Sequence, residues 1–149
     1  MSIVCYDDHG IRFEYPADWD LEVTAEGAIA TVAIQAPGGL VFALITVDDS
    51  CPAPAEVADL ALEAMRDEYP ALDATPALES IGGQKAVGHD VEFLSLDMIN
   101  ACAIRCFRTP RRTVLVFGQW SDLEAEDSIA TLAAVRNSLE ETDAEAPHA

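Results

Sequence analysis

The segment from Gly10 to Val23 constrains the fold most strongly, because it reads as two short strands that are interrupted at Pro16. Side chains alternate between the two sides of a strand, so each strand can turn one apolar side toward a core. These sides carry Ile11, Phe13 and Tyr15 in the first strand and Trp19, Leu21 and Val23 in the second. Three aromatic rings within seven residues therefore predict a dense part of the core close to the start of the chain.

The totals describe an acidic protein with enough apolar residues to fold. Half of the 149 residues are hydrophobic, and 27 acidic residues against 8 Lys and Arg give a net charge of −19. This length fits one domain, which we expect to span 1–140, followed by a flexible acidic tail at 141–149. Such a surface repels nucleic-acid phosphates and anionic membranes, so neither is an expected partner. A run of about 18 apolar residues, which would span a membrane, does not occur.

The extreme acidity has two explanations that the sequence leaves open. One is a salt-loving host with an acidic proteome, and the other is a highly soluble protein from a GC-rich genome, which the 25 alanines fit equally well. Salt screens self-repulsion in any acidic protein, so only failure to fold at low salt would favour the first explanation.

The N-terminal residues and the cysteines bear on the cellular location. Residues 1–8 contain neither a basic region nor a long apolar segment, so we predict no secretory signal, if Met1 is the native start, and a cytoplasmic protein. Cys102 and Cys106 lie four residues apart in a predicted strand, which places their Cα atoms about 13 Å apart and excludes a disulfide. Together with Cys5 and Cys51, we expect them to be reduced and mostly buried.

Further strands are predicted in consecutive pairs that are joined by turns. They are expected at 28–36, 40–47, 76–81, 85–97, 98–107 and 113–120. The strand at 40–47 is apolar in both alternating positions, which predicts a strand covered on both faces, and 98–107 and 113–120 share this pattern.

Two helices are predicted, one in the middle of the chain and one near its end. The first covers 54–69, with Pro54 in its first turn and Pro70 after its end. Its expected buried stripe is Val57, Leu60, Ala61, Ala64 and Met65. The second starts at Ser121, where Ser121 and Glu124 match a capping box. Its expected buried stripe is Ala125, Ile129, Leu132, Val135 and Leu139.

These elements predict an α+β fold. Hairpins imply an antiparallel sheet, and strands that are apolar on both faces need a layer on each side. We therefore expect a three-layer sandwich in which helices flank a central antiparallel sheet of about six to eight strands.

The order of these features resembles the PsbP/Mog-like superfamily, and within it the DcrB-type branch. The resemblance covers the opening from Gly10 to Trp19, the helix that ends near Tyr69-Pro70, Ile81-Gly82-Gly83 before the long hairpin, and the helix after Trp120. It implies the fold above and a binding or accessory role, because members of the superfamily include a photosystem subunit, a Ran-binding factor, bacterial lipoproteins and secretion chaperones. It implies no shared catalytic residues and no cofactor. The missing secretory signal makes this chain closer to the soluble, chaperone-like members.

The best local candidate for a binding site is a cluster of arginines. Arg105, Arg108, Arg111 and Arg112 are half of all the Lys and Arg residues and fall within eight positions. Their guanidinium groups could dock an anion or an acidic partner at the tip of a hairpin. The alternative, which we favour, is that they neutralise an otherwise too negative surface. Trp120 is expected in the core, or partly exposed as an anchor for a partner.

Other chemistry-bearing residues give weaker signals. The cysteine spacing does not match a zinc site, and no metal site is predicted. His89 lies on the apolar side of its strand, where a hydrogen-bonded structural histidine is expected. Ser50-Cys51 beside Asp48-Asp49 has no evident base, and the glycine pairs fit hairpin turns rather than nucleotide loops.

These observations predict a non-catalytic protein-binding module of chaperone or adaptor type. The expected partner is a protein captured by an apolar part of the sheet, and homodimerisation through an edge strand or a sheet face is a further hypothesis. The alternatives are a small enzyme or small-molecule-binding protein with an unrecognised pocket, and a stress or envelope accessory without a defined ligand.

Overall fold

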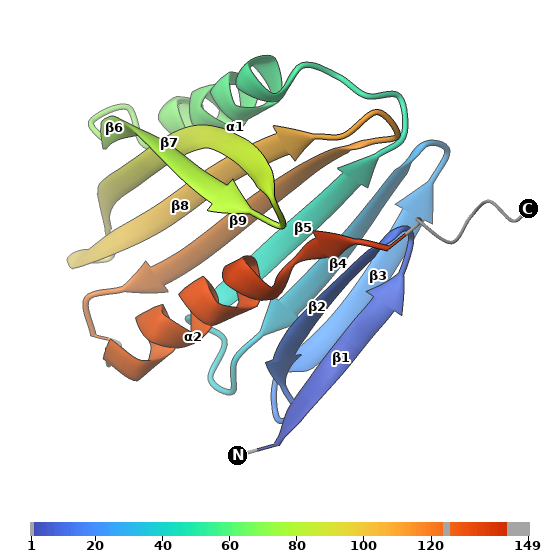
Figure 1. Ribbon diagram of the computed structural model, residues 1–149. Helices are drawn as coiled ribbons and strands as arrows, with labels where there is room; N and C mark the ends of the chain where they lie inside the picture. The colour runs from blue at the N-terminus through green and yellow to red at the C-terminus, as the bar shows by residue number, and fades with distance from the viewer. Residues whose placement is uncertain (1, 124–125, 143–149) are drawn as a thin grey trace, which may run out of the picture.

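A computed structural model describes residues 2–123 and 126–142 (Figure 1). Its centre is a seven-stranded sheet in which every neighbouring pair is antiparallel, with the order β3-β4-β5-β9-β8-β7-β6. The strands are β3 (Asp20–Glu26), β4 (Ile29–Gln35), β5 (Phe42–Asp48), β6 (Asp73–Ile81), β7 (Gln84–Ser95), β8 (Met98–Arg108) and β9 (Thr113–Ser121). The predicted hairpin strands are all present, and they form one sheet.

A second, three-stranded sheet lies against one face of the first. It consists of β1 (Ile3–Asp8), β2 (Ile11–Pro16) and β10 (Glu140–Glu141), with β2 in the middle. The predicted break at Pro16 is confirmed, and its consequence is that β2 and β3 belong to different sheets. Phe13 stacks on Tyr6 with ring centroids 5.2 Å apart, and Ile11 and Phe13 are buried, as the alternation predicted. Trp19 is buried in the turn before β3 rather than in the strand, and Val23 is exposed because β3 is an edge strand of the large sheet.

The helix α1 (Pro54–Glu68) has the predicted bounds within one residue but a different buried stripe. Ala58 and Leu62 are its buried residues, whereas Leu60 is 69 % exposed. The predictions for Leu60 and Ala64 were wrong, because both are exposed and position 60 lies on the solvent side of the helix. The buried stripe follows 58 and 62, with partial cover of Val57, Ala61 and Met65.

The helix α2 (Glu126–Ser138) begins later than predicted. Ser121 ends β9 instead, and its hydroxyl accepts the N–H of Leu123 at 3.3 Å. Glu124 and Ala125 lie outside the described residues. Leu132, Val135 and Leu139 are buried as predicted, but Ile129 is exposed.

The molecule has the three layers that were predicted, with a core on each side of the large sheet. Figure 1 shows α1 on one face and α2 with β1 and β2 on the other. The first core lies between α1 and the strands β7, β8 and β9. The second core lies between the opposite face of the sheet and the layer that contains α2 and β2. β8 is buried on both faces, as predicted. The prediction of two covered faces was wrong for β5, because α1 packs against β7, β8 and β9 and leaves the second face of β5 only partly buried.

The end of the domain lies slightly beyond the predicted boundary. Glu140 and Glu141 pair with β2, and the N–H of Thr142 donates to the carbonyl of Gly10 at 2.9 Å. Residues 141 and 142 are therefore part of the fold rather than of a flexible tail, and residues 143–149 lie outside the described part. Neither α1 nor α2 has the length and apolarity that a membrane crossing requires.

Candidate functional site

The structure separates the four arginines of the predicted cluster. Arg105 lies in the middle of β8 and is only 6 % exposed, whereas Arg108, Arg111 and Arg112 lie at the turn between β8 and β9. Arg105 therefore belongs to a different environment from the other three.

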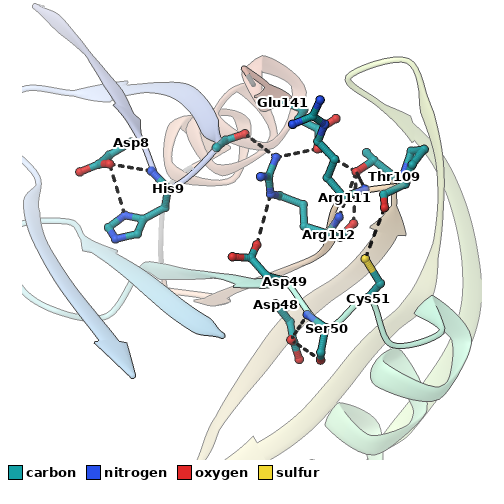
Figure 2. A network of polar contacts seen from close by, with 12 residues as sticks. Asp8, His9, Asp48, Asp49, Ser50, Cys51, Thr109, Arg111, Arg112 and Glu141 are labelled. Atoms are coloured by element: carbon teal, nitrogen blue, oxygen red, sulfur yellow. Dashed lines mark hydrogen bonds and ion pairs between the residues drawn. The ribbon is translucent and has the colours of Figure 1, made fainter. Parts of the chain in front are cut away.

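At the β8–β9 turn, Arg112 joins segments that are far apart in the sequence (Figure 2). Its Nη1 lies 2.7 Å from Glu141 Oε2, and its Nε lies 3.5 Å from Asp49 Oδ1. Nη1 also donates to the carbonyl of Gly10 at 3.3 Å. A Cβ on Gly10 would stand 2.4 Å from the guanidinium carbon, so this close approach requires glycine.

Neighbouring residues extend this network. Arg108 Nη1 donates to the carbonyl of Cys51 at 3.1 Å, and the Thr109 hydroxyl donates to Glu141 Oε2 at 2.7 Å while accepting the N–H groups of Arg111 and Arg112. These contacts bind the turn to the β1–β2 turn, the β5–α1 loop and β10. For Arg112 the contacts with Asp49 and Glu141 favour internal neutralisation over an anion dock, whereas Arg108 donates to a neutral carbonyl.

Arg105 is the centre of a second network, on the face of the sheet that α2 covers. Its Nε lies 2.7 Å from Glu79 Oε1 and its Nη2 lies 2.9 Å from Asp90 Oδ1. Nη1 donates to the carbonyls of Ile104 and His89 at 3.0 and 3.3 Å. The other oxygen of Glu79 accepts Arg136 Nε of α2 at 2.8 Å. Glu79 of β6 thus bridges two arginines from two different layers.

The pKa of Glu79 reflects this position. Burial disfavours the charged carboxylate, but the hydrogen bonds from Arg136 and Arg105 outweigh it and hold the pKa below its ordinary value of 4.5. The carboxylate therefore remains ionised well into the acidic range and keeps both guanidinium groups in place.

Beside this network the sheet is hollowed into a cavity of about 620 Å³. Register explains its shape, because residues paired across antiparallel strands share a face. One row across the sheet is Asp73, Glu92, Ala101 and Trp120, and the next is Thr75, Asp90, Ala103 and Gly118. Ala101 and Ala103 form the floor of the cavity, while longer side chains stand around them.

The cavity has chemically different walls. Asp73, Asp90 and Glu92 form an exposed acidic wall on β6 and β7, and Trp120 lies on the opposite side. Arg105 and Arg136 close one end. Because Glu79 and Asp90 already bind those arginines, the charges that remain unpaired around the cavity are negative.

Exposed apolar residues continue the same face toward the β7–β8 hairpin. Leu94 pairs with Ile99 one rung beyond Glu92 and Ala101, and the two are 68 % and 49 % exposed. Leu96 follows in the turn with a positive φ of 54° and is almost wholly exposed. Leu123 is exposed next to Asp122, whose N–H donates to the Ile99 carbonyl at 2.9 Å. We call these four residues the apolar end.

The other candidate residues have structural surroundings. His89 Nε2 lies 3.0 Å from Asp59 Oδ1 of α1, in agreement with a hydrogen-bonded histidine. The Ser50 hydroxyl donates to Asp48 Oδ1 at 2.6 Å within a turn. Within residues 2–123 and 126–142, no three His, Cys, Asp or Glu side chains come together in a way that could hold a metal ion.

The cysteines are free, and two of the four are buried. Burial raises the pKa of both Cys102 and Cys106 to about 12, so these thiols are protonated and unreactive at neutral pH. The expectation of burial was wrong for Cys5, which is exposed because β1 is an edge strand of the small sheet.

Sequence reasoning found Arg105 and Trp120 but missed the site that contains them. Asp73 and Glu79 of β6 and Arg136 of α2 come from segments far apart in the sequence, and strand register together with the packing of α2 on the sheet brings them to the site. A signal was available in part, because Asp90 and Glu92 occupy alternate positions of β7 while Ala101 and Ala103 do so in β8.

The fold is similar to the folds of several solved structures, although those proteins share little of the sequence. No model of a protein family matches the chain, and neither does any curated protein. Cyanobacterial PsbP (CyanoP) from Synechocystis sp. PCC 6803 is 12 % identical, with a TM-score of 0.67 over 94 % of this chain and 92 % of that one. LpqN, a protein of Mycobacterium tuberculosis involved in cell envelope biogenesis, is 13 % identical, with a TM-score of 0.59 over 93 % and 90 % of the two chains. PA94 from Pseudomonas aeruginosa is 14 % identical, with a TM-score of 0.50 over 91 % and 94 %.

At these identities the likeness establishes the fold alone. The chain has a PsbP-like α+β fold, which confirms the PsbP/Mog-like expectation. The likeness does not single out the DcrB-type branch, which stays a prediction.

Proposed function

We propose that the protein is a non-catalytic protein-binding module, of chaperone or adaptor type, that holds a partner protein against the face of β6–β9. The observation that carries this proposal is the apolar end, where Leu94, Leu96 and Ile99 lie exposed beside an open cavity. Exposed apolar groups that adjoin a hollow with a charged rim are typical of binding surfaces.

Leu96 lies at the tip of the β7–β8 hairpin. Leu96 and Asp97 are the two central residues of the turn between Ser95 and Met98, and both have the positive φ that a two-residue hairpin turn requires. A bulky apolar residue is uncommon at such a position, so the exposed Leu96 supports a binding role.

The proposal assigns the protein to the cytoplasm. Four free thiols, one of them exposed, would remain reduced in that compartment.

A partner protein is favoured over a second copy of this chain. A second copy would bring the same net charge of −19 to the interface. The exposed edge of β3 carries Glu22 and Glu26, and β6 at the other edge contains Pro76, features that discourage pairing between edge strands. Homodimerisation is therefore the weaker form of the proposal.

The test is a capture experiment with matched variants. The tagged protein is used on an extract of the native organism at matched salt, as wild type, as Leu94→Ser/Leu96→Ser and as Leu60→Ser/Leu78→Ser. The control pair is exposed to a similar degree but lies on α1 and on the α1 side of β6. We expect that the wild type and the control variant both capture one specific protein and that Leu94→Ser/Leu96→Ser does not. This protein, once purified, should bind the wild type directly. Equal retention by both variants would contradict the proposed face.

Small-molecule binding is the second candidate function, and the cavity itself favours it. Its volume of about 620 Å³ lies in the range of ligand sites, which is roughly 300–1,000 Å³. A thermal-shift screen of metabolites tests this alternative, and a response that Trp120→Ala abolishes would support it.

A further inference from the structure

We infer that the cavity receives a basic side chain, arginine or lysine, from an apolar segment of the partner protein. This inference rests on the proposed function and names the chemistry of the partner. The apolar residues of the segment would lie on the apolar end, and its cation would enter between the acidic wall and Trp120.

The floor of the cavity leaves room for a long side chain. Ala101 and Ala103 line it from β8, and neither side chain projects beyond a methyl group. Arg136 of α2 lines the cavity on the helix side. The volume of about 620 Å³ therefore leaves room for a long side chain beside α2.

The acidic wall provides the charge that a cation needs. Asp73 and Glu92 are directly paired across β6 and β7, so both side chains rise from neighbouring positions on the same face. Two exposed negative charges on neighbouring positions attract a cation more strongly than either does alone. Asp90 is different, because it already accepts Arg105.

Trp120 completes the recognition of a cation. It lies across Ala101 from Glu92 on the same face and is partly exposed. A guanidinium or ammonium group over an indole ring gains a favourable cation–π interaction, and arginine also stacks on the ring. Its aliphatic stem would contact the alanines of the floor.

An anion is a poor fit to the same cavity. Arg105 and Arg136 are the cationic residues that line it, and both bind Glu79. An incoming carboxylate or phosphate would have to displace Glu79 from a largely buried pair and would approach a protein with a net charge of −19.

The test uses Trp120 as its own reporter. Trp19→Phe leaves Trp120 as the single tryptophan, and its fluorescence is followed during titration with a short peptide that contains one arginine between leucines. The comparison peptides carry citrulline, which is neutral and has nearly the same shape, or glutamate in place of that arginine. We expect the arginine peptide to bind at least about threefold more tightly than the citrulline peptide, and this advantage to shrink as KCl is added.

Two variants of equal charge locate the binding. Asp73→Asn/Glu92→Gln should remove the preference for arginine, whereas Glu22→Gln/Glu26→Gln on the outer face of β3 should preserve it. Equal binding of the arginine and citrulline peptides would overturn the inference, as would tighter binding of the glutamate peptide. If the peptides show no preference for arginine but a purified partner still fails to bind Leu94→Ser/Leu96→Ser, the proposed function remains supported and only the inference about the basic side chain fails.

Discussion

At the scale of single residues, Glu79 is the position where the layers of the molecule depend most on one side chain. It connects β6 both to the buried Arg105 of β8 and to Arg136 of α2. Removal of its carboxylate would take from Arg136 the ion-pair partner that the structure gives it and leave Arg105 with Asp90 alone. Breaking a largely buried ion pair costs far more than the loss of a surface pair.

We predict that Glu79→Gln lowers the free energy of unfolding at neutral pH by about 3 kcal/mol. The folded-state pKa of Glu79 is below its ordinary value, so its contribution is complete above about pH 4.5 and is lost as the pH falls through the folded pKa. The difference between wild type and variant should therefore be largest at neutral pH and shrink in acid. Urea unfolding from pH 7 to 3 measures it, and Glu22→Gln, on exposed β3, is the control. A difference that grows toward low pH would contradict the assignment.

The cysteines give a second prediction at this scale. Cys5 and Cys51 should react with a thiol reagent in the native protein, whereas Cys102 and Cys106 should react only after denaturation, because they are buried with a pKa of about 12. Counting labelled thiols by mass spectrometry tests this. Rapid labelling of all four would show that the core around α1 is open.

At the scale of elements, the sequence predicts the presence of strands and helices better than the orientation of their faces. The alternation in 11–15 correctly placed Ile11 and Phe13 in the core, because a strand has only two sides. A helix offers a continuous range of directions, so α1 could be placed correctly while Leu60 was assigned to the wrong side. β1 was missed, because Ile3 and Val4 are exposed and their apolar pattern carries little burial signal.

The stripe of α1 can be tested with a pair of leucines. Leu62→Ala should lower the free energy of unfolding by about 2–3 kcal/mol, because Leu62 packs against the sheet and its loss leaves a cavity. Leu60→Ala removes the same atoms from the solvent side and should change it by less than about 0.5 kcal/mol. Chemical denaturation of both variants gives the answer, and equal losses would mean that the helix is rotated about its axis.

At the scale of the whole molecule, the fold could be predicted from the order of the elements, whereas the candidate site could not. The three layers follow from hairpins and from strands such as β8 that are apolar on both faces. The cavity depends on which residues of β6, β7, β8 and β9 stand opposite one another. The register of β7 and β8 is set by the turn at Leu96 and Asp97, which contains no glycine and was therefore not predicted. The arginines near the β8–β9 turn drew attention by their density, yet Arg108 and Arg112 bind neighbouring parts of the chain.

The net charge also acts at this scale. We predict that the thermal unfolding midpoint rises with added KCl, because salt screens repulsion among the 27 acidic residues. Circular dichroism in dilute buffer separates the two explanations of the acidity: an unfolded chain at low salt favours a salt-loving host, and a folded one favours a soluble protein from a GC-rich genome. A midpoint that falls with KCl would contradict the role of self-repulsion.

The most direct test of the proposed binding face is a map of backbone amide chemical shifts during titration with the single-arginine peptide. The account predicts that the shifts concentrate at Glu92, Leu94, Ala101 and Trp120, which line the cavity or the apolar end. Amides at the turn of Arg108 and Arg112, and those of β3, should remain unchanged. Shifts concentrated at that turn, or on the α1 side of the sheet, would contradict the account and move the binding site elsewhere.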